Sequence, residues 1–488
     1  MNPLKRLFKQ TFIYGLATVL PRVLSFLLVP LYTSVMSPET YGEISVVFSW
    51  FAIFNVVLAY GMETAFFRFF NKNADKERVI STSLISLLVS SVLFFVVALI
   101  FKKDLASLID VKESLIVYII LILAFDALTI VPFAWLRAQE RPLRYSIVKV
   151  ASVAMNLLLN IFFLTLLPKM AFENGGSLWT AMHKEDFQIE YVFIANVISS
   201  GVAFLWVSGI YFDSKYKFDK RLWNEMLKYA LPVMVAGLAF TVNEVFDRVL
   251  LDRLLPEDVA KAEIGKYSAC YKLAVFMTLF GTAFRLGVEP FFFSHAGAEN
   301  PQKTYAQITN YFVLMGSLIF LGVMVFIDPL KKLLVRDAAF WEAMDIVPII
   351  LLASFCLGIY HNLSVWYKVT DKTKFGAYIS SVGAILTLGI NFVFIPKAGY
   401  MASAWATLTA YGSMMMLSYY FGRKYYPIPY NMRKIVFYLT VSLVFSILSF
   451  YVFNRNLIAG SMLLLLFLGL VYKMEGDKLK IIFLKRGN

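Results

Sequence analysis

Residues 79–101 read VISTSLISLLVSSVLFFVVALIF, a run of 23 positions without a charged side chain. About 20 apolar residues are enough for an α-helix to cross the hydrocarbon core of a bilayer, so this run predicts a membrane-spanning helix. The composition of the whole chain of 488 residues agrees, since 59% of its residues are hydrophobic and 16% are charged. Soluble domains average about 45–50% apolar and about 25% charged residues, which excludes a soluble globular protein.

Thirteen further apolar runs of helical length lie on either side of this one. Such runs disfavour an outer-membrane barrel, whose short strands alternate apolar and polar residues. Together with short connections they use up the chain and leave no room for a soluble catalytic domain. The sequence therefore predicts an all-α integral membrane protein with fourteen transmembrane helices. The runs span roughly residues 11–36, 44–70, 79–101, 114–136, 144–167, 190–212, 226–254, 264–294, 305–328, 345–367, 375–396, 400–422, 432–453 and 456–473.

The basic residues indicate how the chain crosses the membrane. If the N-terminus is cytoplasmic, the cytoplasmic loops and tails carry 28 of the 46 Lys and Arg residues, the opposite side carries 12, and six lie within or at the edge of the spans. Cytoplasmic loops are enriched in Lys and Arg, so both termini are predicted to be cytoplasmic. Lys5, Arg6 and Lys9 precede a run too long for a signal-peptide core, which predicts a retained first helix. Because the net charge of +14 is spread over short loops, no nucleic-acid partner is implied.

The loops and the cysteines argue against an enzymatic or redox activity. The longest connection, residues 168–189, has about 22 residues. A membrane-embedded polymerase or glycosyltransferase is expected to carry a large outer loop with catalytic groups, so transport is favoured over an enzymatic activity. Cys270 and Cys356 lie in apolar runs and the three histidines show no metal spacing, so no disulfide framework, metal site or cofactor is predicted.

An internal repeat covers six helices. A shift of 226 positions superposes residues 22–67 on residues 248–293 with 11 identities, and a shift of 231 aligns a second pair of helices. Six is an even number, so both copies run the same way through the bilayer and are expected to bind substrate between them. The coincident polar pairs are Arg22 with Arg248, Glu63 with Glu289, Arg137 with Lys368 and Asn160 with Asn391.

The repeat sets the expected domain organisation. Two parallel six-helix bundles are predicted, the first in residues 1–213 and the second in residues 214–424. Residues 425–488 fall outside the repeat and are expected to form helices 13 and 14 with a cytoplasmic tail.

Four motifs near turns and helix ends carry a resemblance to a known family. They read SPETYGEIS at 37–45, GMETAFFRF at 61–69, RAQERP at 137–142 and NFVFIPKAGYMASAWATLTAY at 391–411. With these motifs the chain resembles the polysaccharide (O-antigen, Wzx-type) flippases of the multidrug/oligosaccharidyl-lipid/polysaccharide exporter superfamily.

The resemblance implies a function and a set of partners. It implies an alternating-access transporter of two bundles that moves an undecaprenyl-pyrophosphate-linked oligosaccharide from the cytoplasmic to the outer leaflet of the bacterial plasma membrane. The implied partners are that lipid-linked oligosaccharide, membrane lipids, polysaccharide polymerase machinery and a coupling proton or Na⁺.

Charged residues inside the spans are the candidate functional residues. A charge at the bilayer centre costs at least about 2.5–3.5 kcal/mol, so each needs a partner, an aqueous cavity or a route to the headgroups. Arg22 has no acidic residue within four positions and lies near mid-membrane, so it is the strongest candidate, with a structural pair to another helix as the alternative. The candidates for substrate binding are Arg22, Arg248, Lys272 and Arg285, and those for gating or coupling are Glu63, Glu289 and Asp126.

Helical spacing suggests partners for several of these charges. Glu244, Arg248 and Asp252 are spaced i, i+4, i+8, and Arg285 precedes Glu289 by four positions, so pairing within each helix is one interpretation. The other is contact with cargo in a cavity.

A second set of expectations joins different helices. Glu63 lies at nearly the depth of Arg22, so a pair between them is one interpretation, and the repeat offers Arg248 with Glu289 in the same way. Such a pair is either a latch that opens when a pyrophosphate takes the arginine or a packing contact. Asp126 is alone in the middle of its span and is either a protonatable coupling site or a permanently protonated acid. Lys149 is expected to extend to the headgroups, and Lys272 is harder to explain in that way.

The charge tally leaves two cargo classes open. The spans hold five bases and six acids. A cation-coupled multidrug antiporter of the same superfamily would use a lone carboxylate such as Asp126, whereas a flippase for an anionic lipid would use Arg22, Arg248 and Lys272. The resemblance favours the flippase and leaves the antiporter as the alternative.

Overall fold

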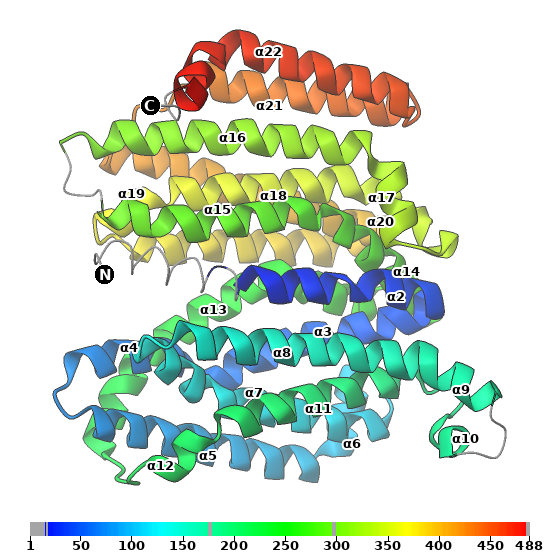
Figure 1. The fold of residues 1–488 in the computed structure, drawn as a ribbon, viewed down its shortest axis with the longest axis vertical. Helices are drawn as coiled ribbons and strands as arrows, with labels where there is room; N and C mark the ends of the chain where they lie inside the picture. The colour runs from blue at the N-terminus through cyan, green and yellow to red at the C-terminus, as the bar shows by residue number, and fades with distance from the viewer. Residues whose placement is uncertain (1–14, 16–17, 174–177, 295–298, 485–488) are drawn as a thin grey trace.

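The structure, a computed structural model, describes residues 15, 18–173, 178–294 and 299–484 (Figure 1). Helices and short turns account for these residues, and no strand occurs among them. Thirteen helical segments of the described chain are long and apolar enough to cross a membrane, the first being Thr18–Val35. The basic residues Lys5, Arg6 and Lys9 lie outside the described residues.

The labelled elements follow the order of the chain. Those of the first half are α2 (Leu28–Val35), α3 (Pro38–Ala59), α4 (Met62–Lys72), α5 (Lys76–Ile100), α6 (Lys102–Ile109), α7 (Glu113–Ala138), α8 (Pro142–Ile161), η1 (Phe162–Leu166), α9 (Leu167–Glu173), α10 (Leu178–Met182), α11 (Gln188–Val207) and α12 (Gly209–Asp213). Those of the second half are α13 (Lys220–Leu254), α14 (Glu257–Tyr271), η2 (Lys272–Ala274), α15 (Val275–Ser294), α16 (Pro301–Val325), α17 (Ile327–Leu334), η3 (Ala338–Asp345), α18 (Ile346–Leu363), α19 (Val365–Val369), α20 (Lys374–Tyr425), α21 (Met432–Ile447), η4 (Leu448–Val452) and α22 (Leu457–Leu484).

α20 crosses the membrane twice. Its 52 residues would form a straight helix about 78 Å long, more than twice the about 30 Å of a hydrocarbon core. The backbone leaves helical geometry at Gly399, with φ +55° and ψ −141°, a conformation that glycine adopts without strain. With two crossings for α20, the thirteen segments of the described chain give fourteen crossings, which confirms the predicted number.

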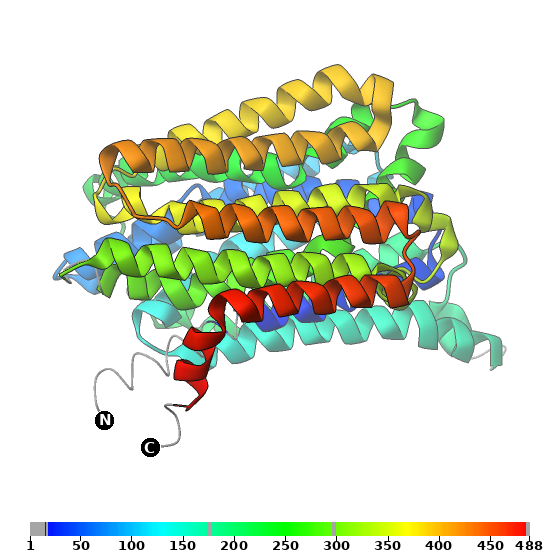
Figure 2. The same ribbon diagram turned by 90° about the horizontal axis from the view of Figure 1, so that it is seen from above.

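The helices lie side by side and their turns gather at two opposite ends of the molecule (Figures 1 and 2). We call the end with the turn at Ser37 the Ser37 end; it also carries α9, α10 and α17 and lies at the right of Figure 1. The opposite end, with the turn at Asp75, is called the Asp75 end.

Polar side chains cap the helices at these turns. Ser37 Oγ accepts the N–H of Thr40 at the start of α3, and Asp75 accepts the N–H of Arg78 at the start of α5. Asp219 caps α13, and the N–H of Leu222 lowers the pKa of its carboxyl group. Such caps are worth about 1 kcal/mol each and fix where the helices begin.

The helices pack in two groups that meet along α13. In the first half α3, α4, α5, α7, α8 and α11 contact one another, and in the second half α14, α15, α16, α18 and α20 do so. α13 contacts α3 and α4 of the first half and α20 of the second, while α21 and α22 pack against α16 at the edge of the molecule (Figure 1). This confirms the predicted fold class of two six-helix bundles with two C-terminal helices. The predicted domain boundaries at residues 213 and 424 stay a prediction.

Two glycines bring the halves into backbone contact at the Ser37 end. A Cβ atom on Gly42 of α3 would lie 1.8 Å from the carbonyl oxygen of Lys261 on α14. A Cβ on Gly265 of α14 would lie 1.9 Å from the carbonyl oxygen of Pro38. Both distances are far below van der Waals contact, so only glycine allows α3 and α14 to approach this closely.

Candidate functional site

A polar cavity of about 400 Å³ lies between the two halves of the chain. The side chains from the first half form what we call the neutral wall, and those from the second half form the charged wall. The neutral wall consists of Ser25, Leu28, Val29, Tyr32, Tyr41, Ile44, Ser45, Phe48, Ser49, Asn156 and Asn196. The charged wall consists of Glu244, Val245, Arg248, Ser268, Tyr271 and Lys272.

The charged wall contains two of the four predicted substrate-binding residues, Arg248 and Lys272. α13 supplies Arg248, and Lys272 begins η2, where α14 ends. Both cations line the cavity, so Lys272 does not need a route to the headgroups. The wall also carries Glu244, one helical turn before Arg248.

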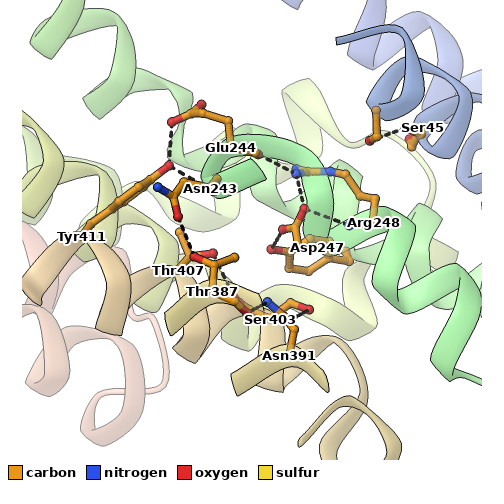
Figure 3. Close-up of polar contacts among 12 residues, drawn as sticks. Ser45, Asn243, Glu244, Asp247, Arg248, Thr387, Asn391, Ser403, Thr407 and Tyr411 are labelled. Carbon is orange, nitrogen blue, oxygen red and sulfur yellow. Dashed lines mark hydrogen bonds and ion pairs between the residues drawn. The ribbon is translucent and has the colours of Figure 1, made fainter. Parts of the chain in front are cut away.

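Arg248 is held by its sequence neighbour and by two aromatic rings. Its Nη1 lies 2.8 Å from Asp247 Oδ1, and its guanidinium lies 4.5 Å from the centre of the Tyr271 ring. Tyr267 Oη donates to the second carboxylate oxygen of Asp247 at 2.6 Å. Asp247 is therefore bonded on both oxygens, which fixes the guanidinium beside the cavity (Figure 3).

The expected ion pairs along this helix are wrong. Arg248 Nη1 donates to the backbone oxygen of Glu244 rather than to its carboxylate. The Glu244 carboxylate instead accepts from Tyr411 Oη at 2.6 Å (Figure 3), and Asp252 pairs with Lys261 at 2.7 Å. Tyr411 of α20 and Lys261 of α14 thus take the place that Arg248 was expected to hold beside these two acids.

A polar cluster joins α13 to the two limbs of α20. Thr387 Oγ1 donates to Asn243 Oδ1 at 2.8 Å, and Ser403 Oγ donates to Asn391 Oδ1 at 2.6 Å across the bend at Gly399 (Figure 3). These residues are buried, and a buried polar group is stable only when it is hydrogen-bonded. The cluster therefore ties the charged residues of α13 to the second bundle.

Arg22 contacts the opposite half of the chain. Its Nη1 donates to Thr282 Oγ1 on α15 at 2.7 Å. Arg285 and Glu244 are close enough to act on it electrostatically. Neither Arg22 nor Arg285 belongs to the two cavity walls.

The expected pair between Arg22 and Glu63 is wrong, as is the expected pair between Arg285 and Glu289. Glu63 on α4 forms an ion pair with Arg137 on α7. Glu289 on α15 lies 2.5 Å from the ammonium group of Lys368 on α19.

The two ion pairs are equivalent under the repeat. Glu63 corresponds to Glu289, and Arg137 corresponds to Lys368. The shift of 226 aligned the two acids and the shift of 231 aligned the two bases. In the structure each acid forms an ion pair with the base of its own half. Each pair lies within one half of the molecule, so neither bridges the halves.

Asp126 lines a second cavity, of about 460 Å³, within the first half and against α13. Its Oδ1 accepts from Ser200 Oγ at 2.9 Å, and Lys149 is close enough to act on it electrostatically. Lys149 Nζ also lies 4.4 Å from the centre of the Phe133 ring, and its extension to the headgroups stays a prediction. Glu63 lines the same cavity, which therefore holds two of the three predicted coupling residues.

Sequence reasoning missed the partners that give these charges their geometry. Asp247, Tyr411, Arg137 and Lys368 were visible in the sequence, but none was assigned to the charge that it contacts. The repeat carried the one usable signal, because it aligned two acids and two bases at fixed offsets.

The fold and the cavity define a class: a multi-pass membrane protein whose two helical bundles face each other across a polar cavity, the architecture of a transporter. A family model described as polysaccharide biosynthesis protein matches residues 7–284, and a second, MatE, matches residues 232–393. The first match covers more than half of the chain, so the chain belongs to the polysaccharide biosynthesis protein family. No curated protein matches the sequence.

Solved structures with the same fold support this placement. A lipid II flippase, MurJ, in an inward closed conformation is 14% identical with a TM-score of 0.74, and the match covers 95% of this chain and 99% of that one. An inward-facing multidrug resistance MATE family transporter of the MOP superfamily is 13% identical with a TM-score of 0.64, covering 88% and 96%. A MOP superfamily transporter from Pyrococcus furiosus, described as having a binding pocket of reverse polarity, is 13% identical with a TM-score of 0.58, covering 85% and 95%. With the two family models, these structures place the chain in the predicted exporter superfamily.

Proposed function

We propose that the protein is a flippase that moves an undecaprenyl-pyrophosphate-linked oligosaccharide across the bacterial plasma membrane by alternating access. One observation carries the proposal: Arg248 and Lys272 line a cavity between the two bundles, where a cargo must pass. A pyrophosphate is an anion whose oxygens take paired, charge-assisted hydrogen bonds from a guanidinium group. The family description, polysaccharide biosynthesis, supports a sugar as the rest of the cargo.

The four predicted bases have different roles in this proposal. Arg248 is oriented by Asp247 and exchanges that contact for a phosphate oxygen, while Lys272 supplies a second charge. Arg22 and Arg285 act on one another electrostatically, and we propose that they receive the pyrophosphate as it enters or leaves the cavity. The polyprenyl tail stays in the lipid, because burying it in a polar cavity would cost free energy.

The coupling residues are proposed in the first half of the chain. Asp126 is a carboxylate that lines a cavity, and such a group can gain and lose a proton or bind Na⁺. Glu63 and Glu289 hold their basic partners within each bundle. We propose that these two pairs act in gating by releasing a base toward an entering anion.

The second candidate function is a cation-coupled multidrug antiporter. The observation in its favour is Glu244, a carboxylate in the wall of the same cavity. Tyr411 occupies that carboxylate by hydrogen bonding, and Arg22 acts on it electrostatically. Both contacts oppose the entry of a cationic drug, so we place this function second.

The proposal also covers the setting of the protein. It would lie in the bacterial plasma membrane with both termini cytoplasmic, act without enzymatic activity and deliver its cargo to polysaccharide polymerase machinery, for example in O-antigen and lipopolysaccharide synthesis. The split of 28 to 12 basic residues between the two sides supports this orientation.

An export assay in cells tests the proposal. Arg22 belongs to the first half and donates one hydrogen bond to Thr282 of the second half, which its guanidinium group can exchange for a phosphate oxygen. We expect Arg22→Ala to abolish surface polysaccharide and Arg22→Lys to reduce it, because an ammonium group cannot bind two oxygens in the same plane. The measurement is surface polysaccharide in a strain whose own copy of the gene is deleted, at matched protein abundance.

Arg221→Ala is the matched control, since this arginine is 93% exposed at the start of α13. It should export at the wild-type level. Wild-type surface polysaccharide from Arg22→Ala would make Arg22 a structural residue and count against the proposal.

A further inference from the structure

The two walls of the central cavity differ in chemistry. The charged wall carries Glu244, Arg248 and Lys272, whereas the polar residues of the neutral wall are serines, asparagines and tyrosines. The cations of the charged wall, Arg248 and Lys272, suit an anionic pyrophosphate. The neutral wall, on the opposite side of the same cavity, offers hydrogen bonds without charge.

The orientation of one amide on the neutral wall is fixed by its neighbours. Asn160 Nδ2 donates to the backbone oxygen of Asn156 at 2.8 Å, and Asn160 Oδ1 accepts from Tyr32 Oη at 2.9 Å. Asn160 Nδ2 also donates to Asn156 Oδ1 at 3.2 Å. These bonds identify which end of the Asn160 amide is the oxygen and which is the nitrogen. Because Asn160 Nδ2 is a donor, the Asn156 atom that it contacts must be the oxygen, and Asn156 Nδ2 therefore points away from Asn160.

Asn156 Nδ2 is buried and has no hydrogen-bond partner among the residues that the structure describes. Asn156 also lines the cavity, whereas Asn160 is fully buried behind it. A buried amide N–H without a partner is costly, so this group favours an acceptor, and a cargo atom in the cavity would supply one.

The remaining polar groups of the neutral wall present acceptors. Ser45 and Ser49 donate their hydroxyl protons to backbone oxygens of their own helix at 2.7 and 2.8 Å, which leaves oxygen lone pairs for a ligand. Asn196 donates its Nδ2 to Val192 at 2.8 Å and keeps its Oδ1 available. One wall therefore offers both a donor and several acceptors.

A sugar hydroxyl both donates and accepts, which is the pattern that this wall complements. A fully ionised phosphate group only accepts hydrogen bonds and an ammonium group only donates them, so neither charged group uses both functions of the neutral wall. We propose that the neutral wall binds the hydroxyl groups of the sugar next to the pyrophosphate, with Asn156 as its principal donor. This inference rests on the proposed function and adds to it the position of the sugar.

Binding by the purified full-length protein in lipid nanodiscs tests the inference with two probes. One is undecaprenyl pyrophosphate without sugar, and the other is the undecaprenyl-pyrophosphate oligosaccharide extracted from cells that lack the transporter. The wild-type protein should bind the sugar-carrying lipid more tightly. Asn156→Ala should weaken that binding about tenfold and leave the sugar-free lipid unaffected, since it removes one buried hydrogen bond to the sugar alone.

Two further variants make the result decisive. Asn156→Leu keeps a side chain of four heavy atoms branched at Cγ but removes the amide, so it should show the same difference between the probes if Asn156→Ala packs poorly. Asn71→Ala removes an exposed asparagine at the Asp75 end and should bind both lipids as the wild type does.

The outcomes separate the inference from the function on which it rests. Equal wild-type affinity for both probes, or an equal loss for both probes in the Asn156 variants, would overturn the sugar-binding wall. Failure of the wild-type protein to bind either probe would instead count against the flippase function. An Arg248→Ala variant that binds both probes as tightly as the wild type would also count against the flippase function.

Discussion

Arg248 illustrates what a sequence can and cannot predict about a charge in a membrane. Its spacing of four residues from both Glu244 and Asp252 is evident in the sequence, and so is its need for a partner. Its actual partner is Asp247, because Tyr267 from α14 holds the second oxygen of that carboxylate. Contacts from neighbouring helices decide between candidate acids, and such contacts cannot be read from one helix.

The second cavity gives a test for Asp126. A carboxylate bonded by Ser200 and facing Lys149 can exchange a proton or bind a cation without leaving its place. We expect Asp126→Asn to keep the protein folded and to remove the dependence of transport on an imposed pH or Na⁺ gradient. Uptake by inverted membrane vesicles, with and without each gradient, measures this directly.

Asp104→Asn serves as the control, since Asp104 is an exposed acid on α6 and should leave gradient dependence unchanged. If Asp126→Asn transport still rises with the gradient as in the wild type, Asp126 has no part in coupling.

The helices and their repeat were the most predictable features. Apolar runs of bilayer length predicted each crossing, and the two limbs of α20 appeared as separate runs because Lys397 and Gly399 interrupt them. The ion pairs at Glu63 and Glu289 were not predicted, although the repeat aligned both acids. They form only when α4 packs against α7 and α15 against α19, which spacing along one helix does not reveal.

The contact between α3 and α14 predicts how the Ser37 end opens. A Cβ at Gly42 would lie 1.8 Å from a backbone oxygen of Lys261, so the helices must separate by roughly 2 Å to restore van der Waals contact. We expect Gly42→Val to stay folded and to shift the protein toward a state open at this end. Spin labels at Glu39 and Asp258 should report a longer mean distance by double electron–electron resonance.

Gly389→Ala is a suitable comparison, because a Cβ there meets nothing within 4 Å. It should leave the distance between the labels unchanged. A distance in Gly42→Val equal to that of the wild type would mean that this contact does not hold the Ser37 end closed.

The orientation of the molecule in the membrane rests on its charge distribution. The turn that precedes α13 carries Lys215 and Lys217, both exposed at the Asp75 end. We expect Lys217→Cys to resist a membrane-impermeant thiol reagent in intact cells and to react once the cells are opened. Lys184→Cys, near α10 at the Ser37 end, should react in intact cells. The reverse pattern would invert the proposed topology.

The central claim is that this two-bundle fold translocates a pyrophosphate-linked sugar through the cavity lined by Arg248 and Lys272. The most direct measurement is translocation in proteoliposomes that contain the undecaprenyl-pyrophosphate oligosaccharide, with an added glycosidase reporting the sugar exposed outside. Vesicles with the wild-type protein should expose nearly all of the sugar, whereas protein-free vesicles and vesicles with Arg248→Ala should expose only the fraction that began in the outer leaflet. Wild-type vesicles that expose no more sugar than protein-free vesicles would contradict the account.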